Sequence, residues 1–522
     1  MFPIIFFSLL FSSSEGARIL GVVSGPTPSH QTFFHPIWKG LIQLGHELTV
    51  ITASPMNNTA INLTEINTDF IYKLWQDEYH TTKLIDKYGK NLYKIVQESR
   101  KGFYKVVDKQ LEHPEVQKLI QGSYGGFDLV IVEFISPVLS AFASKFNCPY
   151  LGVSVTDLNI LYQRFFGHPI HPVLYPDFFI PFDGKMSFKE RFVSCIMSSM
   201  LLMEDFFSDK HIEDQLIKKH FGNNMPSANE ITANVSVILT NVNPAFYLRP
   251  VGPNFIPIGG LAKPEKATPL PQARFKNVLG NIQRFLDDAT DGAIYFSLGT
   301  NIKSANIDRK LQDVFINTFR KIKSLKILWK FDGDIIGLPK NVMVVSWCPQ
   351  QDVLRHPNIK LFITQGGVHS MEEALYFEVP ILGLPFVADQ EQNVRKFVNR
   401  GLGKKIDVKT ITVEIFEENI MELIENPKYK QRVVEISSLS KDQPMTGFDK
   451  TIWWIEYVLR HKGAKNLRNH VVDMPFYQYY LLDVLGVILS IFLITFFLIC
   501  LFIKCLCKMY FIKKRNLKNK SD

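Results

Sequence analysis

The feature that most constrains this chain of 522 residues is the stretch from Leu361 to Asn393, LFITQGGVHSMEEALYFEVPILGLPFVADQEQN. It starts with a short apolar run that ends at Thr364, continues through two glycines, and then enters a helix-forming segment that we expect to open at Ser370, with carboxylates in its first turn. A strand, a glycine turn and a helix in this order direct unpaired backbone N–H groups and the positive end of a helix dipole at an anion. The stretch therefore predicts an anion site at one edge of a parallel sheet.

Polar side chains surround this predicted site. His369 and Glu373 are four residues apart, so they share one face of the helix. A second apolar run, PILGLP, stops before Asp389 and Gln390, which places a carboxylate and an amide at the same edge. Open parallel sheets bind ligands beyond the carboxyl ends of their strands. We interpret the stretch as a nucleotide-diphosphate site with polar groups for a sugar.

The same stretch resembles the signature of the UDP-glycosyltransferase family, which includes the UDP-glucuronosyltransferases. The matching residues are Thr364, Gln365, Gly366, Gly367, Glu373, Val379, Pro380, Pro385, Asp389 and Gln390. Gln365 stands where vertebrate members usually carry His, and is similar to the invertebrate, notably insect, form. The resemblance covers nearly the whole chain. It implies an α/β fold of the GT-B type, in which two Rossmann-like domains face each other across a cleft.

The order of apolar runs and prolines predicts the domain boundaries. Residues 1–16 are an apolar run followed by small residues, which indicates a secretory signal peptide. Strand and helix patterns over residues 17–248 predict a first domain, to which the resemblance assigns the acceptor. Six prolines within residues 249–275 are typical of an inter-domain linker. Residues 276–462 predict the second domain, to which the resemblance assigns the UDP-sugar.

The C-terminal part predicts a membrane anchor. Residues 481–503 are almost wholly apolar and long enough to cross a bilayer as a helix. The tail 504–522 carries seven basic residues against Asp522, which leaves only +3 of the formal charge of +9 to the rest of the chain. The basic balance is thus a topology signal and not a nucleic-acid footprint. We expect a single-pass type I protein with a cytosolic tail and a luminal catalytic part.

The sequence also bears on the compartment. The last residues, KNKSD, resemble the dilysine signal that returns membrane proteins to the endoplasmic reticulum. Three of the six cysteines lie in or beside the predicted span, so no disulfide framework is expected. Glycosylation sequons start at Asn57, Asn62 and Asn234. We expect a glycoprotein of the endoplasmic reticulum membrane.

His30 is the predicted catalytic base. It follows the buried-strand pattern ARILGVV, and its segment matches the family's Pro-Ser-His. A neutral imidazole can remove a proton from an attacking hydroxyl near pH 7. His35 is the local competitor. The orienting carboxylate is predicted to be Glu133, at the end of FDLVIVE, where most vertebrate relatives place Asp; Asp128 lies at the opposite end of that strand.

The remaining predicted site residues follow from the resemblance, which implies binding of the donor. Ser297 resembles a serine that contacts phosphate, and Trp347 and Gln350 resemble residues that stack on and read uracil. Glu373 would accept hydrogen bonds from the ribose, and Arg249 is a further candidate. The residues expected around the diphosphate are Thr364, Gln365, Gly366, His369 and Ser370, and those expected on the sugar are Asp389 and Gln390.

We predict neither a metal nor a cofactor. Asp332 and Asp334 imitate the metal-binding Asp-x-Asp of another glycosyltransferase fold, but the segment Asp-Gly-Asp directly follows a strand and is typical of a turn. The helix N-terminus already supplies positive potential for a leaving diphosphate.

These observations predict an inverting transfer of glucose or glucuronate from a UDP-sugar to a hydroxyl of a small lipophilic acceptor, as in detoxification or conjugation. The Gln365 form favours glucose by resemblance only. An alternative is a membrane-anchored ligand-binding protein that keeps the fold without turnover. A nicotinamide dehydrogenase is disfavoured, because the loop after the first strand lacks GxGxxG. The sequence leaves the oligomeric state open, and a homo-oligomer is compatible with it.

Overall fold

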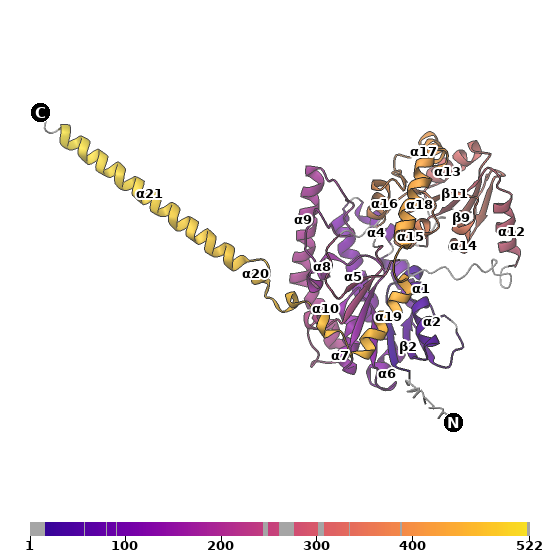
Figure 1. Cartoon of the computed structure of the whole chain (residues 1–522), viewed down its shortest axis with the longest axis horizontal. Helices are drawn as coiled ribbons and strands as arrows, with labels where there is room; N and C mark the ends of the chain where they lie inside the picture. Colours follow the sequence, from indigo (N-terminus) through magenta and orange to yellow (C-terminus); the bar gives the residue numbers. More distant parts are fainter. Residues whose placement is uncertain are drawn as a thin grey trace, which may run out of the picture. The chain divides into compact units, whose positions relative to one another are not determined.

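The computed structural model describes residues 16–56, 58–79, 81–89, 91–243, 249–259, 276–300, 307–333, 335–386 and 389–518. The chain divides into two compact units, residues 1–468 and residues 469–522. The first unit contains two parallel sheets (Figure 1). Most of the predicted signal peptide and residues 260–275 of the predicted linker lie outside the described residues.

The first sheet has seven parallel strands in the order β3-β2-β1-β4-β5-β6-β7. Its strands are β1 (Arg18–Val22), β2 (Glu47–Thr52), β3 (Leu63–Asn67), β4 (Leu129–Glu133), β5 (Tyr150–Ser154), β6 (Val237–Thr240) and β7 (Phe255–Pro257). Every residue of β4 and β5 is buried, as is usual when helices cover both faces of a parallel sheet. The strands predicted at ARILGVV, ELTVIT, FDLVIVE and SVILTN are confirmed.

The helices of this first domain alternate with its strands. They are α1 (Pro28–Phe33), α2 (His35–Gln43), α3 (Phe70–Glu78), α4 (Thr81–Tyr88), α5 (Leu92–Leu111), α6 (Pro114–Ile120), α7 (Pro137–Phe146), α8 (Ile160–Gln163), α9 (Phe188–Glu204), α10 (Lys210–Phe221) and α11 (Ala228–Ala233). A π-helical turn, η2 (Asp205–Asp209), joins α9 to α10 without a break.

The second sheet has six parallel strands in the order β10-β9-β8-β11-β12-β13. Its strands are β8 (Ala293–Ser297), β9 (Lys326–Lys330), β10 (Val342–Val345), β11 (Ile359–Thr364), β12 (Ile381–Gly383) and β13 (Gly403–Lys405). Its helices are α12 (Lys276–Asp287), α13 (Arg309–Lys321), α14 (Gln350–Arg355), α15 (Val368–Tyr376), α16 (Gln390–Asn399), α17 (Val413–Glu425) and α18 (Pro427–Lys441).

Both sheets have a point at which the strand order reverses. In the first sheet this point lies between β1 and β4, and in the second between β8 and β11. Ligands of open parallel sheets bind outside the carboxyl ends of the strands at such points. In the second sheet Thr364 pairs with both Ser297 and Gly383, so three strand ends lie level there. The GT-B expectation of two Rossmann-like domains is confirmed at the level of fold.

Helix α15 starts earlier than the sequence indicated. The predicted start at Ser370 is wrong: the helix begins at Val368, and Gly367 is its N-cap with an extended backbone (φ −62°, ψ 140°). The first turn therefore carries no acidic residue. The correction moves the free N–H groups of the helix next to the glycine pair, because the turn is shorter than we expected.

The last helix of the first unit returns to the first domain. Helix α19 (Gly447–Arg460), which the sequence analysis included in the second domain, packs against α2 and β6 (Figure 1). Its Ile455 and Val458 are buried in one apolar cluster with Ile19 and Trp38. The chain thus crosses between the domains twice within the described residues of this unit.

The second unit contains the long helix α21 (Leu482–Lys518), preceded by the short helix α20 (Phe476–Tyr479). Residues Leu482–Ile512 are long and apolar enough to cross a membrane, with a mean hydropathy of 3.0. The helix continues past the predicted end of the span at residue 503, because no Gly or Pro interrupts the sequence from there to Lys518.

Candidate active site

The closest polar contact at the reversal point of the first sheet joins His30 and Glu133. His30 lies in α1, which begins at Pro28 just beyond β1, and Glu133 is the last residue of β4. The Nδ1 atom of His30 lies 2.5 Å from Oε1 of Glu133. The other carboxylate oxygen accepts the backbone N–H groups of Ser24 at 3.1 Å and Gly25 at 2.6 Å. The buried carboxylate is therefore fixed by three contacts.

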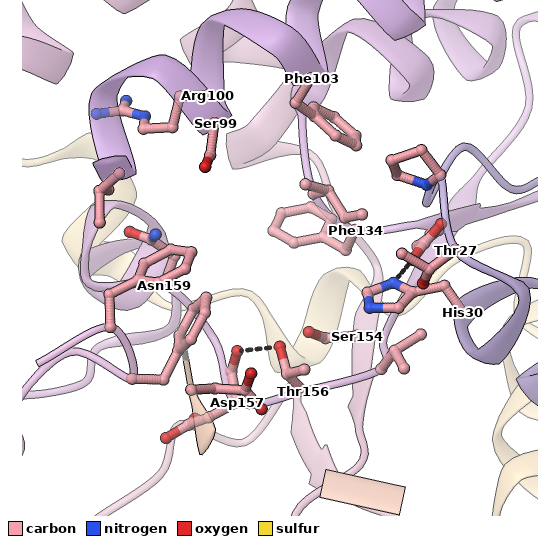
Figure 2. A pocket seen from close by; sticks show the side chains of 18 of the residues that line it. Thr27, His30, Ser99, Arg100, Phe103, Phe134, Ser154, Thr156, Asp157 and Asn159 are labelled. Atoms are coloured by element: carbon pink, nitrogen blue, oxygen red, sulfur yellow. Dashed lines mark hydrogen bonds and ion pairs between the residues drawn. The ribbon is translucent and has the colours of Figure 1, made fainter. Parts of the chain in front are cut away.

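This contact sets the protonation of the imidazole. Burial by itself lowers the pKa of His30, but the charge of Glu133, its hydrogen bond and the charge of Asp389 together outweigh burial and raise the pKa above its usual value. A carboxylate on Nδ1 selects the tautomer that carries its proton there. The Nε2 atom then keeps its lone pair, and it faces the cavity described next (Figure 2).

A cavity of about 300 Å³ adjoins His30. Its wall is largely aromatic and apolar, with polar side chains from α5 and from the segment after β5 (Figure 2). The aromatic members are Trp75, Phe103, Tyr104, Phe134, Tyr162, Phe178 and Phe179. The polar members opposite His30 include Ser99, Asn159 and Thr156 (Figure 2). Thr300 and Asp389 of the second domain complete the lining, so both domains contribute to it.

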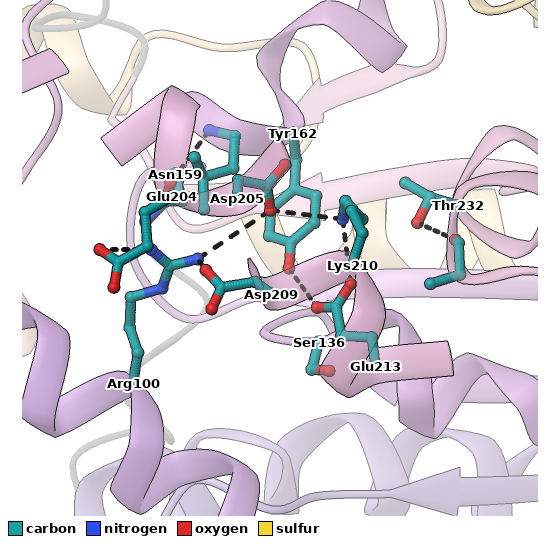
Figure 3. A network of polar contacts seen from close by, with 12 residues as sticks. Arg100, Ser136, Asn159, Tyr162, Glu204, Asp205, Asp209, Lys210, Glu213 and Thr232 are labelled. Atoms are coloured by element: carbon teal, nitrogen blue, oxygen red, sulfur yellow. Dashed lines mark hydrogen bonds and ion pairs between the residues drawn. The ribbon is translucent and has the colours of Figure 1, made fainter. Parts of the chain in front are cut away.

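A network of charged side chains supports the far wall of the cavity (Figure 3). Arg100, which lines the cavity, pairs with Asp209 and lies 3.9 Å from Asp205. Lys210 contacts the same Asp205 at 3.5 Å and the buried Glu213 at 3.0 Å. The hydroxyls of two cavity residues, Tyr104 at 3.2 Å and Tyr162 at 3.5 Å, donate to Glu213. The network joins α5, η2 and α10 behind the cavity.

The predicted diphosphate residues gather at the reversal point of the second sheet. Ser297, Thr364 and Gln365 are buried at the ends of β8 and β11. Gly366 has φ of 91°, and a Cβ there would lie 2.4 Å from Val394, so this turn requires glycine. The side-chain oxygen of Gln365 is buried without a protein hydrogen-bond partner. These features form a polar recess beside the first turn of α15.

Glu373 and Gln350 lie in contact on the next part of the same edge. The amide of Gln350 donates to Glu373 at 2.6 Å and to Ser370 at 3.0 Å, and Gln351 donates to Glu373 at 3.0 Å. Burial raises the pKa of Glu373, although these two amides oppose the shift. Trp347, in the loop between β10 and α14, has 56 % of its surface exposed. A flat aromatic face and a carboxylate are thus available near the strand ends.

His369 and Asp389 connect this edge to the first domain. The ring of His369 stacks on Phe33 of α1 with centroids 5.2 Å apart and planes 9° apart. Burial, with a smaller effect of His30, lowers the pKa of His369 to about 3, so this imidazole is neutral near pH 7. Burial also raises the pKa of Asp389, whose carboxylate accepts the amide of Asn393 at 2.6 Å. Gln390 accepts the N–H of Phe386 at 3.0 Å.

Arg249 and the competing residues lie elsewhere. The guanidinium of Arg249 lies 3.4 Å from Asp157 and 5.3 Å from the ring centroid of Tyr175, so the structure brings it to the first domain and not to the end of β11. His35 contacts the carbonyl of Ser54 at 2.9 Å and does not line the cavity.

No metal cluster of three or more His, Cys, Asp or Glu side chains is found where the structure describes the chain. Asp334 lies outside the described residues, and Asp332 follows β9 in a bend. The prediction that no metal or cofactor is needed stays a prediction.

Sequence reasoning missed most of the cavity wall. Ser99 and Phe103 face the cavity from the middle of α5, where the sequence shows only a charged helical pattern. The segment SVTDLN after β5 could have been found, because it follows a buried strand next to β4 and carries polar residues. Phe33, which stacks on His369, gave no sequence signal at all.

Comparisons with known proteins agree with this geometry. A family model described as "UDP-glucoronosyl and UDP-glucosyl transferase" matches residues 23–518. UDP-glycosyltransferase UGT5 of Dactylopius coccus is 32 % identical over 530 residues, covering 98 % of this chain and 96 % of that protein. UDP-glucuronosyltransferase 2B7 of Homo sapiens is 30 % identical, with 92 % of each chain covered.

The solved structure of spinosyn forosaminyltransferase SpnP matches with a TM-score of 0.58 and 15 % identity over 85 % of this chain and 100 % of that one, a likeness of fold alone. The crystal structure of the glycosyltransferase VinC, solved in complex with dTDP, matches with a TM-score of 0.53 at 15 % identity, covering 85 % of this chain and 100 % of that one. Two parallel sheets with aligned switch points, a match over almost the whole chain and relatives at this level of identity agree: the chain belongs to the UDP-glucuronosyl and UDP-glucosyl transferase family and is a UDP-glycosyltransferase with the GT-B fold.

Proposed function

We propose that this enzyme transfers glucose or glucuronate from a UDP-sugar to a hydroxyl of a small apolar acceptor, with inversion at the anomeric carbon, as in detoxification or conjugation. The observation that carries the proposal is the cavity wall: it contains the His30–Glu133 pair from the first domain and Asp389 from the second. An acceptor in this aromatic cavity would have its hydroxyl next to Nε2 of His30.

In the proposed reaction the acceptor hydroxyl gives its proton to Nε2 of His30 while its oxygen forms a bond to C1 of the sugar. The bond from C1 to the diphosphate oxygen breaks on the opposite face, and its electron pair leaves with UDP. The imidazolium formed in this step is stabilised by the Glu133 carboxylate, which the N–H groups of Ser24 and Gly25 hold in place.

For the donor, we propose that the diphosphate lies against the first turn of α15, where the N–H groups of Val368, His369 and Ser370 begin the helix. Glu373 would exchange its contacts with Gln350 and Gln351 for the ribose hydroxyls. Asp389 and Gln390 would bind the sugar, and Trp347 would stack on the uracil. The positive end of α15 stabilises the departing diphosphate, so the proposed mechanism needs no resident metal.

We further propose that α21 anchors the enzyme in the membrane of the endoplasmic reticulum with the two-domain unit in the lumen. The support is the apolar length of Leu482–Ile512 and the basic residues that follow it.

The direct test is a transfer assay with membranes that contain the full chain. UDP-glucose and UDP-glucuronate, carrying different isotopes, compete for a panel of phenols, and the glycosides are identified by mass. We expect β-linked glycoside from one of the two donors. Binding of UDP without any product from any acceptor would support the ligand-binding alternative and contradict the proposed function.

A further inference from the structure

Helix α9 and η2 expose a continuous row of large apolar side chains. We call this row the apolar stripe, and its members are Phe188, Phe192, Ile196, Met200, Met203, Phe206 and Phe207. Their exposed fractions lie between 37 % for Met200 and 75 % for Phe207. Residues of a helix spaced three or four apart lie on one face, so the stripe is one surface and not a scatter of single side chains.

The polarity of α9 is the reverse of that of an ordinary surface helix. The side that packs on the protein buries two serines and a leucine, Ser194, Ser198 and Leu201. The large apolar residues point outward. A helix of a water-soluble domain usually places its apolar stripe on the core. This arrangement exposes a surface that water does not favour, at a cost of roughly 25 cal/mol per Å².

Buried ion pairs hold the end of the stripe in this outward position. Asp205 and Asp209 begin and end η2, and both point inward to Arg100 and Lys210 (Figure 3). The two residues that directly follow Asp205 are Phe206 and Phe207, which the inward anchoring of the aspartates leaves on the outer side. Turning these rings inward would break the ion pairs of Asp205 and Asp209, so their exposure is built into the fold.

The charges next to the stripe suit a lipid headgroup region. Lys185, Lys189 and Arg191 are exposed around the start of α9. The one carboxylate among them, Glu190, accepts Arg395 at 3.1 Å and the N–H of Ser187 at 2.7 Å. A helix with an apolar face and basic flanks is typical of an element that lies in a membrane interface.

The chain itself keeps a membrane within reach. Only residues 469–481 separate the two-domain unit from α21, and a fully extended chain of that length spans at most roughly 45 Å. We propose that the apolar stripe lies in the interface of the bilayer that α21 crosses; this inference rests on the proposed membrane anchor. Because Arg100 and Tyr162 belong both to the network behind η2 and to the cavity wall, the surface that touches lipid is joined to the acceptor cavity.

The test uses the full chain in lipid nanodiscs with benzoylphenylalanine placed at one position at a time. The stripe positions are Phe192 and Ile196, the positive control is Phe492 in α21, and the negative control is Ile336, which is as exposed as Phe207 but lies in the second domain. After irradiation, covalent adducts are identified by mass. We expect lipid adducts from Phe192, Ile196 and Phe492, and none from Ile336.

The possible failures are distinct. Lipid adducts from Phe492 but not from Phe192 and Ile196 would overturn the stripe proposal and leave the anchor intact. The absence of adducts at Phe492 as well would overturn both. Cross-links from the stripe to a second copy of the chain would show that the stripe is a dimer interface and would also overturn the proposal. A second variant, Met203→Glu, should lower the lipid adduct yield at Phe192, whereas Ile336→Glu should not.

Discussion

Nδ1 of His30 and Oε1 of Glu133 lie 2.5 Å apart, although 103 positions separate the two residues in the chain. They meet because β1 and β4 are neighbours in the sheet, so the segment after one strand faces the end of the other. The Glu side chain, one methylene longer than the Asp expected from vertebrate relatives, reaches the imidazole and also two backbone N–H groups. The longer carboxylate is therefore compatible with the role of orienting the base.

Glu133→Gln should change the pH dependence as well as the rate. The transfer needs neutral His30, so kcat/KM should rise with pH through the pKa of His30, which Glu133 helps to raise despite burial. Without the anion, burial dominates, the pKa falls, and the acid limb of kcat/KM moves to lower pH. The plateau should fall by about 10²–10⁴-fold, because the imidazolium loses its partner. The pH profile of phenol glycosylation measures both effects.

The matched control is Glu47→Gln, which changes an exposed carboxylate on the neighbouring strand β2. Its pH profile should be that of the natural enzyme. If Glu133→Gln leaves the acid limb in place, then either His30 does not titrate in catalysis or Glu133 does not set its pKa.

Gly25→Ala should damage the same pair by a steric route. A Cβ at Gly25 would lie 2.6 Å from Cβ of His30, 2.7 Å from its Nδ1 and 2.7 Å from Oε1 of Glu133. Because these distances are too short, the imidazole and the carboxylate must separate, and transfer should fall by about tenfold or more. UDP affinity should stay the same, since the second-domain site is untouched. Gly126→Ala, where a Cβ meets no atom within 4 Å, is the control and should leave kcat unchanged.

Glu373→Gln should weaken nucleotide binding. The substitution removes a charged acceptor that the ribose would use, and a hydrogen bond to a charged group contributes about 1.5–3 kcal/mol, or roughly a 10–100-fold increase in the Kd of UDP. Titration calorimetry with UDP measures this change. Glu425→Gln at the exposed end of α17 should have no effect. An unchanged Kd for Glu373→Gln would remove this residue from the proposed ribose contact.

The parts of the fold that could be predicted depend on neighbours in the sequence. Strand patterns, the glycine turn before α15 and the positions of His30 and Glu133 at strand ends all follow from local composition and from the rules for parallel sheets. The start of α15 was misplaced, because the turn is so short that Gly367 itself caps the helix.

The parts that could not be predicted depend on residues far apart in the chain. Ser99 and Phe103 line the cavity only because α5 packs over the end of the sheet, and α19 joins the first domain only through tertiary contacts. The pairing of Gln350 with Glu373 connects two helices that no local pattern relates. The apolar stripe of α9 was partly visible as a Phe-rich segment, but its outward direction was not, since it is set by the buried partners of Asp205 and Asp209.

The most direct test of the proposed mechanism is to compare transfer and UDP binding in the His30→Ala variant of the full-length enzyme. If the imidazole removes the proton of the acceptor, glycoside formation at pH 7 should fall by about 10²–10⁴-fold while the Kd of UDP stays that of the natural enzyme. A His30→Ala enzyme that forms product at the natural rate would contradict the account.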